Sequence, residues 1–171
     1  MWSAENVHNV IAALLSGILI CVAVSDVLNR RIPNAAVAAL VGLFALWALA
    51  DRGASLGPGL AAAAIGFGVG FVLYTLGVMG AGDVKLFAAV ALFTGLSYLH
   101  LFALATVLVG GVMAIVTLTA NPRRALVMFT LKGRGDFGRG IPYGVAIAAG
   151  GLIAVWGALT GALPVDILSR T

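Results

Sequence analysis

Charge is scarce in this sequence of 171 residues. Only 9% of the residues are Asp, Glu, Lys or Arg, whereas 62% are hydrophobic and the mean hydropathy is +1.13. Soluble domains carry about 25% charged residues. A soluble chain of this length could not hide so many apolar side chains, because a large share of its residues must face water. The composition therefore excludes an ordinary soluble domain and predicts an integral membrane protein.

Residues that commonly bind metals are equally scarce. The chain has one cysteine, Cys21, and two histidines, His8 and His100, which lie far apart in the sequence. They form no obvious metal-binding set, so we expect neither a metal nor a cofactor. Cys21 falls inside the first apolar run with no basic residue near it. A cysteine in such surroundings is expected to be a small buried side chain, not a nucleophile.

Long apolar runs are what the chain has in abundance. A helix needs about 20 apolar residues to cross the hydrocarbon core of a bilayer. Six runs qualify or nearly so: 10–28, 32–50, 56–79, 84–99, 100–120 and 141–163. The fourth is short and joins the fifth almost without a break. The runs show no apolar/polar alternation and are too long for strands. We therefore expect one membrane domain over residues 1–171, an all-α bundle of six transmembrane helices.

Glycine pairs inside these runs predict close helix packing. Gly66 and Gly70 are four residues apart in the third run, and Gly157 and Gly161 repeat this spacing in the sixth. Small residues at this spacing let the backbones of membrane helices approach one another.

Most basic residues fall on one side of the predicted bundle. Eight of the ten Lys and Arg residues lie in the same set of loops: Arg30, Arg31, Lys85, Arg123, Arg124, Lys132, Arg134 and Arg139. The positive-inside rule places these loops in the cytoplasm, including the loop 121–140, and both termini outside. The net charge of +4 then reflects topology and contact with an anionic inner leaflet, and we expect no nucleic-acid partner.

Two aspartates lie at cytoplasmic ends of the predicted spans. Asp26, in "SDVLNRRIPN", ends the first span, and Asp83, in "GAGDVK", begins the fourth. They are 57 positions apart (83 minus 26) but are expected at the same membrane depth. Acids at such depth usually face a bundle interior or a wet cavity. Either residue alone could be an ordinary charge at a helix end, but two on one face favour a functional site.

The residues around these acids could support such a site. Gly80 and Gly82 permit a tight turn and the close approach of a substrate chain before Asp83. Lys85 can extend to the membrane surface, either as an anchor or as a catalytic group. Three residues after Asp26 can fix the first turn of the second span, cap helix ends or orient a carboxylate: Asn29, Pro33 and Asn34.

Two carboxylates in one site repel each other when both are ionised, so they tend to share a proton. The ionised group can take a proton from water while the neutral one donates to a peptide carbonyl oxygen. This chemistry predicts an aspartic protease with Asp26 and Asp83 as catalytic residues. Two alternatives remain. A proton- or ion-coupled transporter also uses intramembrane acids, although its site tends to lie near the bilayer midplane. A non-catalytic membrane scaffold is the other.

"GAGDVK" resembles the GxGD signature of membrane aspartyl proteases. Together with "SDVLNRRIPN" and the late "IPYGVAIAAGG", it makes the chain similar to the prepilin peptidases of type IV pili and related secretion systems, from the first span to the last. The resemblance implies a multi-pass protein of the bacterial inner membrane. It also implies that Asp26 and Asp83 cut the leader from prepilins or pseudopilins after a Gly, at the cytoplasmic face.

One departure from the family pattern is informative. Larger members of this family carry paired CxxC motifs in an extra cytoplasmic region and also methylate the new N-terminus. This chain has a single cysteine and only a short stretch ahead of the first span. It resembles the short, peptidase-only form associated with tight-adherence (Flp-type) pili, and we expect no methyltransferase activity.

Overall fold

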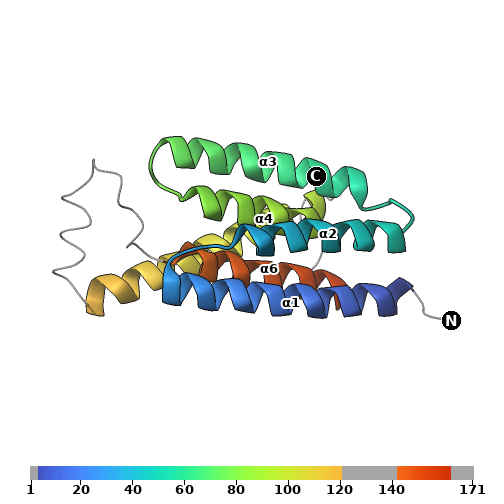
Figure 1. The fold of residues 1–171 in the computed structure, drawn as a ribbon, viewed down its shortest axis with the longest axis horizontal. Helices are drawn as coiled ribbons and strands as arrows, with labels where there is room; N and C mark the ends of the chain where they lie inside the picture. The colour runs from blue at the N-terminus through green and yellow to red at the C-terminus, as the bar shows by residue number, and fades with distance from the viewer. Residues whose placement is uncertain (1–3, 121–141, 163–171) are drawn as a thin grey trace.

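The protein is a bundle of helices. The computed structural model describes residues 4–120 and 142–162 (Figure 1). Its helices are α1 (Ala4–Asn29), α2 (Asn34–Ala50), α3 (Leu56–Thr75), α4 (Ala81–Ala120) and α6 (Tyr143–Leu159). Neither described stretch contains a strand. The predicted all-α class is therefore confirmed, whereas the predicted loop 121–140 lies outside the described residues.

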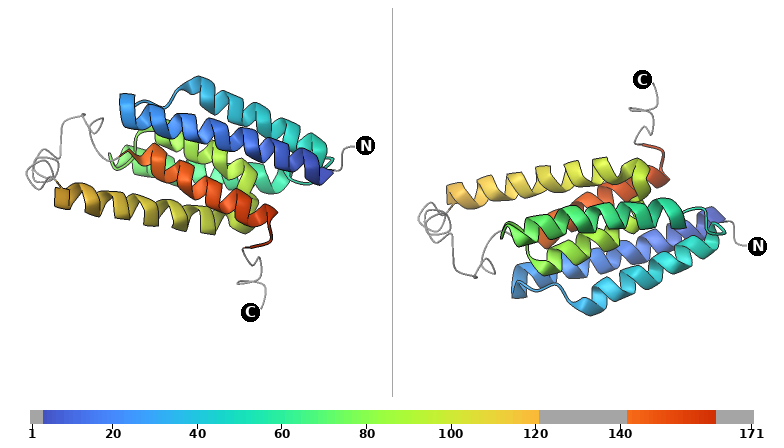
Figure 2. Two further views of the ribbon diagram at one scale, coloured as in Figure 1. Left: turned by 90° about the horizontal axis from the view of Figure 1, so that it is seen from below. Right: turned by 90° about the horizontal axis from the view of Figure 1, so that it is seen from above.

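Helix α4 folds back on itself at Gly95. This residue has φ 58° and ψ −175°, a conformation open essentially only to glycine. The rings of Phe87 and Phe102 stack with their centroids 4.4 Å apart. In a straight helix these residues, 15 positions apart, would be separated by about 22 Å. Residues 81–94 and 96–120 are thus two antiparallel segments (Figure 2). The prediction of two segments here was right, but the boundary lies at Gly95 and not between residues 99 and 100.

The other predicted boundaries differ by a few residues. α1 begins at Ala4, six residues before the predicted start at Val10, so the polar residues ahead of the apolar run are also helical. α3 ends at Thr75, four residues before the predicted end, and α6 ends at Leu159. Gly161 has φ 64° and lies beyond that end, so the predicted helical pairing of Gly157 with Gly161 is wrong. A glycine in the left-handed conformation commonly terminates a helix.

The glycine pair in α3 does serve packing. A Cβ atom added at Gly66 would lie 3.0 Å from the ring of Phe87, and one added at Gly70 would lie 3.0 Å from Val84. Both positions are buried against the first segment of α4. The small residues therefore let α3 and α4 approach closely, as the spacing predicted.

The described helices have the length and surface of a multi-pass membrane protein. Three of them are long and apolar enough to cross a bilayer: Asn6–Asn29, Leu56–Thr75 and Ala81–Thr117, the last containing the reversal at Gly95. α2 and α6 are shorter apolar helices. Large apolar side chains cover the outside, among them Leu49 and Val107, which are 75% and 69% exposed. Cys21 is also exposed and not buried as expected, because it lies on the outer face of α1.

Successive segments alternate in direction (Figures 1 and 2). The α1–α2 link, the α3–α4 link and the first residue of α6 consequently lie at one end of the bundle, which we call the site end. A continuous apolar core runs away from it between α1, α4 and α6, and the largest fully buried side chains of these helices are Leu15, Leu19, Val22, Leu86, Val90, Phe102, Ile147 and Val155. This core holds the three helices that form the site end in register.

The reversal at Gly95 generates a prediction about stability. Gly95→Ala should lower the free energy of unfolding by about 1–3 kcal/mol, because alanine is strained in this conformation. A Cβ atom would meet only Pro58, at 3.6 Å, so the loss is expected from the backbone and not from a clash. The measurement is an SDS unfolding titration of purified protein in mixed micelles.

Gly111→Ala is the matched control. A Cβ atom at Gly111, in the second segment of α4, would meet nothing within 4 Å. This variant should be neutral or more stable by up to about 1 kcal/mol. Equal stabilities for Gly95→Ala and Gly111→Ala would show that the turn does not depend on glycine.

Candidate active site

Asp26 is buried at the site end, near the C-terminus of α1. Its side chain is only 7% exposed, which is unusual for a carboxylate in a largely apolar chain. The Gly144 N–H, from the second residue of α6, donates a hydrogen bond of 2.8 Å to Asp26 Oδ2. The next N–H, of Val145, donates a bond of 3.1 Å to the carbonyl oxygen of Pro142. The first N–H groups of a helix have no partner within it, so α6 can offer the Gly144 N–H to α1.

Gly144 approaches Asp26 too closely to carry a side chain. A Cβ atom built on it would lie 2.8 Å from Asp26 Oδ2 and 3.1 Å from both Cβ and Cγ of Asp26. A separation of 2.8 Å is almost never found around a real Cβ atom, and 3.1 Å is tighter than most such contacts. The absence of a side chain at residue 144 therefore allows the backbone of α6 to reach the carboxylate.

Asp83 occupies the third position of α4 and is held by the residue that precedes the helix. The Gly80 N–H donates a hydrogen bond of 3.2 Å to Asp83 Oδ2. An acid at this helix position commonly reaches back to the N–H of the capping residue. A Cβ atom at Gly80 would lie 2.9 Å from the same oxygen. The turn before α4 thus fixes the direction of the Asp83 side chain.

Gly82 joins the two halves of the site. A Cβ atom at Gly82 would lie 3.4 Å from Cβ of Ile32, in the link between α1 and α2. The start of α4 therefore rests against the segment that follows Asp26. The carboxylates of Asp26 and Asp83 are close enough for the charge of one to act on the other. Two acids far apart in the sequence are thus brought together at the site end.

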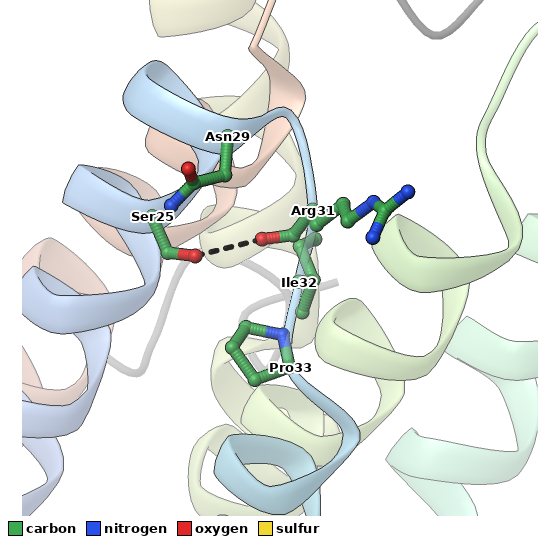
Figure 3. A pocket seen from close by; sticks show the side chains of 5 residues that line it. All are labelled: Ser25, Asn29, Arg31, Ile32 and Pro33. Carbon is green, nitrogen blue, oxygen red and sulfur yellow. Dashed lines mark hydrogen bonds between the residues drawn. The ribbon is translucent and has the colours of Figure 1, made fainter.

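The backbone after Asp26 is fixed by local hydrogen bonds. Arg30 adopts a left-handed conformation, with φ 53°, and its N–H donates a bond of 3.0 Å to the carbonyl oxygen of Asp26. The Ser25 hydroxyl donates a bond of 2.9 Å to the carbonyl oxygen of Arg31 (Figure 3). The positive charge of Arg30 also acts on the Asp26 carboxylate. These contacts end α1 just after the acid and turn the chain toward α2.

An open cavity of about 550 Å³ lies beside this turn, and its lining residues are Ser25, Asn29, Arg31, Ile32 and Pro33 (Figure 3). Pro33 was predicted in the first turn of the second span. It is the residue that caps α2, one position earlier, with φ −64° and ψ 128°. Its carbonyl oxygen accepts a bond of 3.0 Å from the Ala36 N–H. The cavity leaves room for a chain from outside the bundle beside the turn that follows Asp26.

Two of the predicted supporting residues stand apart from the acids. Asn34 is the first residue of α2, and Lys85 follows Asp83 in α4; both are exposed. No hydrogen bond or ion pair involves either side chain in the part of the chain that the structure describes. The structure therefore assigns them no contact with Asp26 or Asp83.

Gly144 and Ser25 are site residues that sequence reasoning missed. "IPYG" was noted only as the opening of a helix, and nothing local indicates that its glycine meets an acid 118 positions earlier. Ser25 directly precedes Asp26, but its bond to Arg31 depends on the left-handed turn at Arg30. Helix and loop propensities predict neither the contact of Gly144 with Asp26 nor that of Ser25 with Arg31.

The assembled site has the parts needed for acid–base chemistry on water. It places two carboxylates at the same end of the bundle, each bound at one oxygen by a glycine N–H. Two such groups can share a proton, one acting as base and the other as acid. An open cavity lies beside the turn that follows Asp26.

Comparison with known proteins agrees with this chemistry. The model of the type IV leader peptidase family matches residues 13–115, a stretch of 103 positions (115 − 13 + 1) that contains both acids. No curated protein and no solved structure matches the sequence significantly. Because the matched stretch covers more than half of its length, the chain belongs to the type IV leader peptidase family.

Proposed function

We propose that this protein is an aspartic endopeptidase that removes the leader of prepilins or pseudopilins, cutting after a Gly with Asp26 and Asp83. Membership of a leader peptidase family supports peptide-bond hydrolysis. The observation that supports the proposal is that both acids lie at one end of an apolar bundle, where the charge of Asp26 acts on Asp83. Family membership also favours a peptidase over a transporter.

The reaction follows from one proton shared by the two acids. The ionised carboxylate takes a proton from water as the water oxygen attacks the carbonyl carbon of the scissile bond. The neutral carboxyl donates its proton to the carbonyl oxygen, which gives a neutral tetrahedral diol. The proton taken from water then passes to the departing nitrogen, the C–N bond breaks, and one diol hydroxyl returns a proton to the dyad. The products are a carboxylic acid and an amine.

The position of the site suits a substrate that is anchored in the bilayer. The acids lie where helices end, and an open cavity lies beside the turn that follows Asp26. A substrate whose apolar helix lies in the membrane would present the bond just before that helix at this depth. A Gly before the scissile bond would let the substrate backbone approach the carboxylates closely.

We propose that all six helical segments span the membrane, with both termini outside and the site end in the cytoplasm. The alternating directions of the segments support this topology (Figures 1 and 2). The site end carries Arg30, Arg31 and Lys85, as the positive-inside rule expects of a cytoplasmic end. The remaining five residues of the predicted cytoplasmic set lie outside the described residues: Arg123, Arg124, Lys132, Arg134 and Arg139. The membrane would be the bacterial inner membrane, whose anionic cytoplasmic leaflet attracts these cations.

We further propose that the chain is the short, peptidase-only form that serves Flp-type pili, without methyltransferase activity. The described residues form one helical bundle with the acids at one end. The sequence has a single cysteine and lacks the paired CxxC motifs of larger members, which supports this part of the proposal. Incubation with a cleaved pilin and a labelled methyl donor tests this part, and label in the pilin N-terminus would contradict it.

Removal of either acid generates the main prediction. Asp26→Asn and Asp83→Asn should each lower the rate of prepilin cleavage by at least about 10²-fold, because each removes one partner of the acid–base pair. The measurement uses purified protein in detergent or liposomes with a prepilin of its own operon or species. Asp51→Asn is the matched control, since this acid lies in the α2–α3 link at the opposite end. Cleavage at the wild-type rate by either dyad variant would contradict the proposed mechanism.

The topology gives a separate prediction. In a Cys21→Ser background, a cysteine that replaces Arg52 should react with a membrane-impermeant thiol reagent added to intact spheroplasts. A cysteine that replaces Asn29 should react only after the membrane is permeabilised. Both positions are exposed and occupy opposite ends of the bundle. The reverse labelling pattern would place the acids on the outer side and overturn the orientation.

A further inference from the structure

The start of α6 is a second fixed element of the site, besides the two acids. We propose that Gly144 is a positioning residue: its N–H and its missing side chain hold the Asp26 carboxylate in the orientation needed for catalysis. The proposal rests on the proposed peptidase function. It assigns α6 a part in the reaction, although α6 lies outside the stretch that the family model matches.

The geometry at residue 144 restrains Asp26 in two ways. The hydrogen bond of 2.8 Å from the Gly144 N–H fixes the position of Oδ2. The glycine backbone also lies against the whole side chain, since a Cβ atom there would be 3.1 Å from both Cβ and Cγ of Asp26. The carboxylate is buried and cannot turn away without losing this donor. Rotation of the side chain is therefore restricted before substrate binds.

The helix α6 is itself held in place by contacts that do not involve Asp26. Gly150 lies against Thr106, and Gly151 lies against Val90 and Leu19 so closely that neither position has room for a side chain. Further along, the indole N–H of Trp156 donates a bond of 2.9 Å to the Ser16 hydroxyl in α1. These contacts fix α6 against both α1 and α4. Gly144 thus belongs to a rigid support and does not simply follow the acid.

A purely structural reading makes different predictions. Asp26 could serve only as a cap that satisfies the free N–H groups of α6, and such caps contribute to stability. Loss of the contact would then reduce the amount of folded protein without changing the turnover of each folded molecule. A positioning role instead changes the chemical step, because small displacements of a catalytic group lower the rate steeply. The separation of kcat from KM distinguishes the two roles.

The first test is Gly144→Ala. The added methyl group should displace the Asp26 carboxylate and lower kcat by about 100-fold, with KM changed by less than about twofold. Rates are expressed per folded protein, measured by monodisperse elution in detergent and helical circular dichroism. Gly17→Ala, in α1, is the matched control, because a Cβ atom there would meet nothing within 4 Å. A folded Gly144→Ala protein with the kcat of Gly17→Ala would overturn the proposal.

The second test reads the hydrogen bond without catalysis, by solution NMR of amide exchange in micelles. Gly144 is the second residue of α6 and Gly82 the second of α4, but only the Gly144 N–H has a hydrogen-bond partner among the described residues. Gly144 should exchange about tenfold or more slowly than Gly82, and Asp26→Ala should remove the difference. Equal exchange in the wild type, or protection that persists in Asp26→Ala, would overturn the proposal.

These outcomes separate the inference from the function on which it rests. If Asp26→Asn cleaves prepilin normally, the dyad itself is wrong. If Asp26→Asn is inactive while folded Gly144→Ala retains its kcat, the dyad stands and only the positioning role fails. The exchange measurement applies in either case, because it needs neither substrate nor turnover.

Discussion

A carboxylate buried in an apolar bundle is the constraint on which this structure depends. Burying such a group without hydrogen-bond partners is strongly unfavourable. The fold meets this requirement at Asp26 with the Gly144 N–H of α6, and the missing side chain of Gly144 makes the close approach possible. α1 and α6, at opposite ends of the chain, are thereby joined at the point where the reaction is proposed to occur.

Glycines also allow close contact between helices in the rest of the bundle. The start of α4 lies against the segment that follows Asp26, and Gly66 and Gly70 let α3 lie close to α4. The turn at Gly95 returns the second segment of α4 alongside the first. That second segment supports α6 through Thr106. Glycines at separate positions thus bring three helix ends to one site.

The sequence was sufficient for some of this arrangement and not for the rest. The chain reverses direction after each apolar run. The end of the first run, at Asp26, and the start of the fourth, at Asp83, are therefore expected at the same end of the bundle. The turn at Gly95 was misplaced because hydropathy carries no information on φ, and the chain between residues 84 and 120 is apolar throughout most of its length. The contact of Gly144 with Asp26 could not be predicted at all. It depends on how α1 and α6 pack, and the residues that fix this packing are distributed over three helices.

The central claim is that the carboxylates of Asp26 and Asp83 lie side by side in the folded protein. Dipolar recoupling by solid-state NMR can test it in lipid bilayers, with ¹³C placed selectively in the side-chain carboxyl groups of aspartate. The account predicts a coupling between the two carboxyl carbons at a separation of no more than about 6 Å, which disappears when Asp83 is replaced by unlabelled asparagine. If the two signals are resolved and show no coupling, the carboxylates do not share a site and the account is contradicted.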